Sequence, residues 1–154
     1  MNESIGTLVL HCVIPLAPMG KARPIVTRNG TYMPKLYKDW VAAAVLHIRP
    51  LQAGLVADDE PVSSRIEAIH KRPKRLTLRE DGGTCSVARY PGPARQPCPR
   101  ARPDLDNTIG SVWDACTRAG VWGDDCQVTD SSESKRYAAV GEDAHVVVTV
   151  RRLV

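Results

Sequence analysis

The side chains best suited to chemistry in this sequence are acidic. Asp104 and Asp106 stand two residues apart in the segment RPDLDN, and the pair Asp124-Asp125 begins 18 residues after Asp106. Carboxylates that converge in a folded protein repel one another, which raises their pKa values unless a cation binds between them. Such hard oxygen ligands favour magnesium or manganese. A bound ion of this kind can align a water molecule and stabilise a phosphodiester in its transition state.

A helix is predicted over residues 104–119, so that the first two aspartates stand at its start. Pro103 keeps the preceding backbone extended, so that side chains at positions i and i+2 there point to one side. Gly120 stands where a C-cap glycine belongs. The predicted apolar stripe of this helix consists of Leu105, Ile109, Val112, Trp113 and Cys116.

The length of this helix, roughly 22 Å at 1.5 Å per residue, separates its two ends. Asp124 and Asp125 therefore rejoin Asp104 and Asp106 only if the following strand doubles back, or if a second subunit supplies Asp125. The sequence leaves both arrangements open. A plainer interpretation also stands, in which the first pair caps a helix and the second pair forms a turn.

The remaining elements predict an α+β fold, with a mixed or antiparallel sheet and two main helices in one small domain, 1–154. A hairpin is expected over residues 25–32, around Asn29-Gly30. A helix is expected over residues 35–48, with the apolar stripe Leu36, Trp40, Ala43, Ala44 and His47. Strands are expected over residues 6–14, 61–70, 126–137 and 144–153.

Composition excludes several classes of protein. The 154 residues are 43% apolar and 25% charged, which is ordinary for a soluble domain. No apolar run approaches the ~18 residues of a membrane span, and the N-terminus does not resemble a signal peptide. Five cysteines without a C-x-x-C pair, and four scattered histidines, indicate reduced thiols rather than a zinc site. We therefore expect a cytoplasmic protein that makes no membrane contact.

The charge is unevenly distributed along the chain. Residues 1–103 carry a net charge of +8, and residues 104–154 carry −4. A basic surface suits a polyanion, and an acidic cluster suits a divalent cation. The Pro/Arg-rich segment at about 80–103 is predicted to be a basic loop within the domain.

Together these features resemble the RusA-type Holliday junction resolvases, which are small phage and prophage endonucleases that cut four-way DNA junctions. The shared landmarks run in family order over residues 20–140. They are Gly20-Lys-Ala-Arg-Pro24, Gly30-Thr-Tyr32 with Tyr37 and Trp40, Arg102-Pro-Asp-Leu-Asp-Asn107, Asp114-Ala115, Ala119-Gly-Val121, Asp124-Asp-Cys-Gln-Val128 and Lys135-Arg-Tyr137.

The resemblance implies a magnesium-dependent homodimer (manganese being the other candidate) that acts on branched DNA in a bacterial or phage-infected cell. Asp104, Asp106 and Asp125 match the catalytic, metal-binding aspartates of the family, and Asp124 would assist them. The basic residues that the resemblance and the basic loop assign to DNA contact are Lys21, Arg23, Arg102, Lys135 and Arg136.

One position departs from the family pattern. The family commonly has a lysine four residues after the second aspartate, whereas this chain has Gly110. Asp106, Gly110 and Asp114 lie within about 80° on one side of the helix. A cation at that position would stabilise negative charge on the reacting phosphate. Lys135, Arg136 or a residue of a partner chain is expected to replace it, or else catalysis is weakened. In another interpretation, Gly110 leaves space for DNA or a neighbouring helix to approach.

Three hypotheses follow from these observations. The first is a magnesium-dependent, structure-selective endodeoxyribonuclease that makes paired incisions in branched DNA. The second is a junction-binding protein whose nuclease activity has decayed, a hypothesis prompted by Gly110. The third, outside the family, is a magnesium-dependent nucleotide hydrolase with no preference for branched DNA.

Overall fold

The computed structural model describes residues 6–73, 96–97 and 101–153. Most of the predicted basic loop lies outside these residues. The elements, in chain order, are β1 (Thr7–Ile14), β2 (Ile25–Thr27), β3 (Gly30–Tyr32), α1 (Lys35–Ile48), the short 3-10 helix η1 (Arg49–Leu51), β4 (Val62–His70), β5 (Gln96–Pro97), α2 (Leu105–Ala119), a second 3-10 helix η3 (Asp125–Gln127), β6 (Val128–Tyr137) and β7 (His145–Arg152). The α+β prediction is confirmed.

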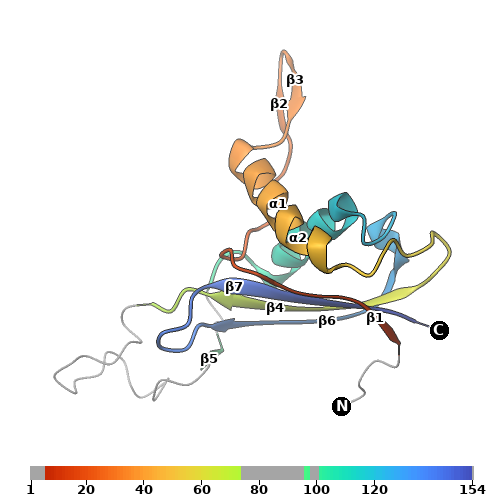
Figure 1. Cartoon of the computed structure of the whole chain (residues 1–154). Coiled ribbons are helices and arrows are strands. Elements are labelled where there is room, and N and C mark those ends of the chain that lie inside the picture. The colour runs from red at the N-terminus through yellow and green to blue at the C-terminus, as the bar shows by residue number, and fades with distance from the viewer. Residues whose placement is uncertain (1–5, 74–95, 98–100, 154) are drawn as a thin grey trace.

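The main sheet has the strand order β1-β7-β4-β6-β5. Its pairs are antiparallel except for β4 and β6, which run parallel. Both α-helices lie on one face of this sheet (Figure 1). Because β4 and β6 are parallel, the chain must cross that face between them, and α2 forms this crossover.

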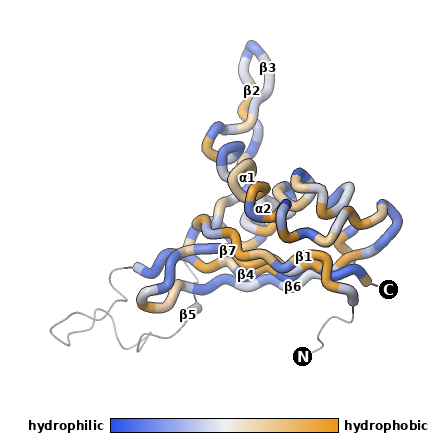
Figure 2. The backbone as a smooth tube through the Cα atoms, viewed as in Figure 1, coloured by the Kyte–Doolittle hydropathy of each residue, from blue (hydrophilic) through white to orange (hydrophobic). Residues whose placement is uncertain are grey.

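The core lies between the sheet and the two helices. Val146, Val148 and Val150 of β7 are fully buried there, and they belong to the same buried apolar cluster as Val112 and Cys116 of α2. Figure 2 shows hydrophobic colours along the strands and along the helix segments nearest to them. Cys12 and Cys116 are buried free thiols, in agreement with their predicted role as small core residues. Within the described part of the chain, neither helix has the length and apolarity needed to cross a membrane.

Helix α1 has the predicted bounds, and its predicted apolar stripe is right in part: Trp40 and Ala44 are buried, but Leu36, Ala43 and His47 lie outside the buried stripe. Leu36 is 71% exposed, and His47 is exposed as well. The segment is apolar around more than half of its circumference, so two stripes fit the helical spacing. The helix buries the stripe that faces both α2 and the sheet, which consists of Tyr37, Trp40, Val41, Ala44, Val45 and Ile48.

Helix α2 begins and ends as predicted. Asp104 is its N-cap, in extended conformation, and Gly120 is its C-cap, with a φ of 82°. Of the predicted stripe, Val112 and Cys116 are fully buried. The buried face also includes Thr108 and Ser111, two polar residues that the apolar pattern did not select. Both hydroxyls are paired with backbone carbonyls, since Thr108 Oγ1 donates to Asp104 O (3.1 Å) and Ser111 Oγ donates to Met19 O (2.5 Å) in the loop after β1.

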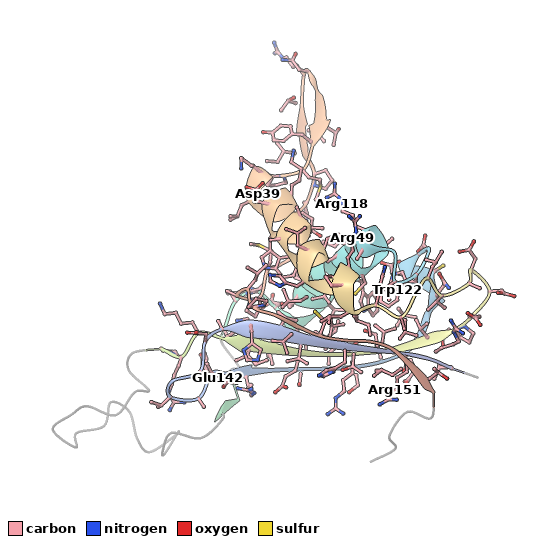
Figure 3. The ribbon with its side chains drawn as sticks, in the orientation of Figure 1. Asp39, Arg49, Arg118, Trp122, Glu142 and Arg151 are labelled. Carbon is pink, nitrogen blue, oxygen red and sulfur yellow. The ribbon has the colours of Figure 1, made fainter. Side chains whose placement is uncertain are left out.

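The turn between β6 and β7 is held by an ion-pair network. Arg136 Nη1 and Nη2 donate to the two carboxylate oxygens of Glu142 (2.7 and 2.8 Å), and Arg136 Nε donates to Glu67 (2.7 Å). Figure 3 shows Glu142 at this turn, at the end of the sheet opposite Arg151. The hydrogen bonds from Arg136 hold the pKa of Glu142 at about 2.

This network predicts an acid-dependent loss of stability. A carboxylate with a depressed pKa stabilises the fold above its unfolded-state pKa, and that contribution is lost as the pH falls through the folded-state value. We expect wild type to lose about 1–2 kcal/mol of unfolding free energy between about pH 4.5 and pH 2 through Glu142, after discounting for its partial exposure. Urea unfolding at a series of pH values measures this. Glu142→Gln should be less stable at neutral pH and flatter in acid, and an equally steep acid loss would contradict the assignment.

Candidate functional site

Asp104 and Asp106 stand at the N-terminus of α2 with their carboxylates available. The Asp104 backbone carbonyl accepts the first helical hydrogen bond, from Thr108 N (3.0 Å), but its side chain makes no capping hydrogen bond. That carboxylate instead accepts from Arg102 Nη1 (2.7 Å), which is largely exposed. Asp106 is exposed in the first turn. Neither carboxylate is needed to cap the helix, so both can serve a ligand.

Asp124 and Asp125 lie in a turn that is built differently. Asp124 Oδ1 accepts a hydrogen bond from Cys126 N (3.0 Å) and thereby caps η3. That hydrogen bond is the main cause of a lowered pKa for Asp124. The pKa of Asp125 is raised, first by its burial and then by a hydrogen bond with Asp124. The two pKa values move in opposite directions because the N–H of Cys126 favours the charged form of Asp124, whereas burial favours the neutral form of Asp125.

Gln127 holds this turn against the rest of the protein. Its Oε1 accepts from the backbone N–H groups of Gly123 (2.9 Å) and Asp124 (3.3 Å). Its Nε2 donates to the carbonyls of Ala57 (2.7 Å) and Glu60 (3.2 Å). The side chain is 7% exposed, so these hydrogen bonds are shielded from water. Gln127 therefore fixes where Asp124 and Asp125 lie.

The chain does double back after α2, but Asp125 meets the helix at Asp114. Asp114, Asp124 and Asp125 line one cavity of about 770 Å³ together with Lys21, Tyr37 and Arg118. Asp114 and Lys21 are also among the groups that shift the pKa of Asp125. Asp106 lies eight residues before Asp114, roughly 12 Å along the helix. The prediction that Asp125 shares one metal site with Asp104 and Asp106 stays a prediction.

Both carboxylate oxygens of Asp114 accept hydrogen bonds, which the sequence did not predict. Its Oδ1 accepts from Lys21 Nζ (3.1 Å), and its Oδ2 accepts from the hydroxyl of Tyr37. Burial and this hydrogen bond raise the pKa of Tyr37, so its hydroxyl remains a donor at neutral pH. The sequence marked Asp114 in two ways, as part of the landmark Asp114-Ala115 and by its place on the same helix side as Asp106 and Gly110. The contributions of Lys21 and Tyr37 depend on contacts distant in sequence.

The donors at both acidic pairs suit a magnesium or manganese ion in their chemistry. Among the residues that the structure describes, no three histidine, cysteine or acidic side chains form a group that could hold a metal ion. Magnesium commonly uses only one or two protein carboxylates, and its remaining ligands are waters and substrate phosphates. A pair such as Asp104 with Asp106 is therefore sufficient for this kind of binding.

The predicted DNA-binding residues fall into two groups. Lys21, Arg23 and Arg102 are exposed beside α2. Lys135 and Arg136 are adjacent on β6, so their side chains point to opposite faces of the sheet. Lys135 Nζ donates to Ala101 O (3.1 Å), close to the start of α2. Glu67 and Glu142 already balance the charge of Arg136. The assignment of Arg136 to DNA contact stays a prediction.

The three tryptophans pack as expected rather than lining the site. Trp40 and Trp122 are buried. Trp122 Nε1 donates to Thr117 Oγ1 (2.7 Å), and Trp113 Nε1 donates to Ser64 Oγ (3.1 Å). Figure 3 shows Trp122 in the interior, near the end of α2.

A mixed sheet covered on one face by two helices, with two carboxylates at a helix N-terminus beside exposed cations, suits a small enzyme that acts on a polyanion. The model of the family Endodeoxyribonuclease RusA matches residues 15–151, and the chain belongs to this family. Membership implies Holliday junction resolvase nuclease activity. A search of curated proteins gave no match.

The geometry of the Asp124-Asp125 turn predicts the effect of removing Gln127. Gln127→Ala deletes four hydrogen bonds and leaves buried backbone groups without partners, so we expect a loss of about 2–3 kcal/mol of unfolding free energy. Urea denaturation measures the loss. Thr129→Ala, at an exposed position two residues further on, should change stability by less than about 0.5 kcal/mol. A Gln127→Ala protein as stable as wild type would show that this side chain does not hold the turn.

Proposed function

We propose that this protein is a magnesium-dependent, structure-selective endodeoxyribonuclease that resolves four-way and other branched DNA junctions by paired phosphodiester cleavage. The single observation that carries the proposal is that Asp104 and Asp106 stand at a helix N-terminus with no capping role, beside Arg102. Family membership supports the nuclease activity and the branched substrate. The metal and the homodimer are parts of the proposal.

In this proposal the aspartates hold the metal. Asp104 and Asp106 provide oxygen ligands from the start of α2, and Asp125 with Asp124 provides the second pair. A bound magnesium or manganese ion would align the attacking water and stabilise charge on the phosphodiester in the transition state. Arg102 and Arg23 would bind phosphates of the DNA backbone on either side of the cut, and Lys21 would contact the DNA backbone as well.

The separation of the two acidic pairs bears on the proposed dimer. Within one chain, Asp125 lies beside Asp114 rather than beside Asp106. Either the turn that contains Asp125 moves toward the N-terminus of α2 when metal and DNA bind, or Asp125 of the partner subunit completes the site. Both arrangements give a dimer two sites, which suits paired incisions in opposing strands. Selectivity would come from the shape and deformability of the junction.

A second candidate function is junction binding without efficient cleavage, and Gly110 is the observation that favours it. A glycine at that position supplies no charge to the reacting phosphate. This candidate and the nuclease share a substrate and differ only in turnover. Cleavage and binding must therefore be measured on the same DNA.

The test is Asp106→Asn on a synthetic four-way junction. We expect magnesium-dependent paired nicks from wild type and a cleavage rate at least about 1,000-fold lower from the variant, because a metal ligand is lost. Junction affinity should be equal or tighter, since removing a carboxylate lessens its repulsion of phosphate. Gel assays of cleavage, and of binding with calcium in place of magnesium, measure the two effects.

The matched control is Asp59→Asn, which removes an exposed aspartate from a turn outside the acidic pairs. It should cut at the wild-type rate. Normal cleavage by Asp106→Asn would refute the site. Tight binding by a wild type that does not cut would select the second candidate function.

A further inference from the structure

The side chain of Lys21 lies across α2 at Gly110. A Cβ atom built on Gly110 would stand 2.8 Å from Lys21 Cδ, 3.3 Å from its Cβ and 3.6 Å from its Cγ. Beyond this crossing, Lys21 Nζ reaches Asp114 Oδ1 at 3.1 Å, one helical turn further on. The aliphatic part of Lys21 therefore occupies the space that any other residue at position 110 would fill.

The backbone that carries Lys21 is fixed to α2 at two residues, one on each side of Gly20. Met19 O accepts from Ser111 Oγ (2.5 Å), and Lys21 N donates to Asn107 O (2.8 Å). Between them, Gly20 lies so close to the start of the helix that an added Cβ would be 2.8 Å from Pro103 Cβ. Because the loop is anchored on both sides of Gly20, Lys21 leaves it at a defined point over the helix.

The ammonium group of Lys21 lies in the acidic cavity. Asp114, Asp124 and Asp125 line this cavity with it, and Tyr37 holds the second oxygen of Asp114. An ammonium group has three N–H donors, and Asp114 accepts one of them. The side chain of Lys21 is 47% exposed, so its remaining donors can reach a ligand from solvent.

We propose that Lys21 supplies the cation of the active site from the loop. We propose further that Gly110, which has no side chain, leaves free the surface of α2 across which the Lys21 side chain lies. This inference rests on the proposed nuclease function, and Lys21 would contact a non-bridging oxygen of the scissile phosphate. The sequence left open which residue replaces the family lysine at position 110. Our proposal assigns this role to Lys21 rather than to Lys135 or Arg136.

Lys21 acts in this proposal through charge alone. In hydrolysis the water oxygen forms a bond to phosphorus, and one phosphorus–oxygen ester bond breaks. The products are a phosphate monoester and a free hydroxyl, and the two protons of the water are shared between the leaving hydroxyl and solvent. Lys21 stays protonated throughout and stabilises the charge that accumulates on the phosphate oxygens.

The first test compares Lys21→Met with Lys35→Met. Lys35 also pairs with an aspartate, Asp39 (2.5 Å), but it is 85% exposed on α1 and outside the cavity. With saturating enzyme and magnesium, Lys21→Met should slow single-turnover junction cleavage about 100-fold or more. Its junction affinity, measured with calcium, should weaken less than about tenfold because only one phosphate contact is lost. Lys35→Met should match wild type in both measurements.

The second test uses position 110, where activity should fall while stability changes little. Gly110→Ala should shift the thermal unfolding midpoint by less than about 3 °C, because the better helix propensity of alanine is offset by the displacement of Lys21 from Asp114. The same variant should cut more slowly, since its methyl group displaces Lys21. In the double variant Lys21→Ala/Gly110→Lys, the amine would project from the helix itself, and cleavage should recover at least about tenfold over Lys21→Ala.

The outcomes separate the two proposals. If wild type does not cut the junction, the proposed nuclease function fails. If wild type cuts and Lys21→Met cuts equally fast, only the role of Lys21 is refuted. If Gly110→Ala cuts at the wild-type rate, the proposal that Gly110 leaves space for the Lys21 side chain is likewise refuted.

Discussion

The apolar face of the main sheet must be covered, and this constraint places every other part of the molecule. Val146, Val148 and Val150 are fully buried beneath the helices. Burial of this kind is worth about 25 cal/mol for each Å² of apolar surface removed from water. It positions α2 with Val112 and Cys116 against the sheet, which leaves Asp106, Gly110 and Asp114 on the side that receives the loop and the cavity. The site is thus built on the face of α2 that the core does not use.

Local signals in the sequence were sufficient to predict most of the elements. Pro34 and Pro50 bracket α1, Asn29-Gly30 marks the hairpin, and Gly120 ends α2 in the left-handed conformation. These features act over a few residues, so they can be read without knowledge of the fold. The stripe of α1 could not be read in this way. Its segment offers two apolar faces, and the choice between them depends on α2 and the sheet.

The acidic pairs of the site were also visible in the sequence, but their surroundings were not. Asp104, Asp106, Asp124 and Asp125 were selected by spacing and residue type. The attachment of Lys21 to Asp114 joins residues 93 apart, and that of Tyr37 joins residues 77 apart. Arg136 is a case in which the sequence pointed to a ligand and the fold supplies other partners. Its basic type predicted DNA contact, whereas the fold pairs it with Glu67 and Glu142. Residue type shows which chemistry is possible, and tertiary contacts decide which groups take part.

At Gly110, residue type and tertiary contacts lead to different conclusions. A glycine inside a helix costs roughly 1 kcal/mol relative to alanine. In isolation it suggests a weakened site, because it removes a charged side chain from the active face. In the folded chain the carbon atoms of Lys21 occupy the space beside Gly110, and in our proposal the charge therefore comes from the loop and not from the helix. Glycine lowers the helix propensity at this residue, but it allows the loop that carries Gly20 and Lys21 to lie directly on α2. With Lys21 in the proposed role, Gly110 moves the lysine from the helix to the loop and does not remove the cation.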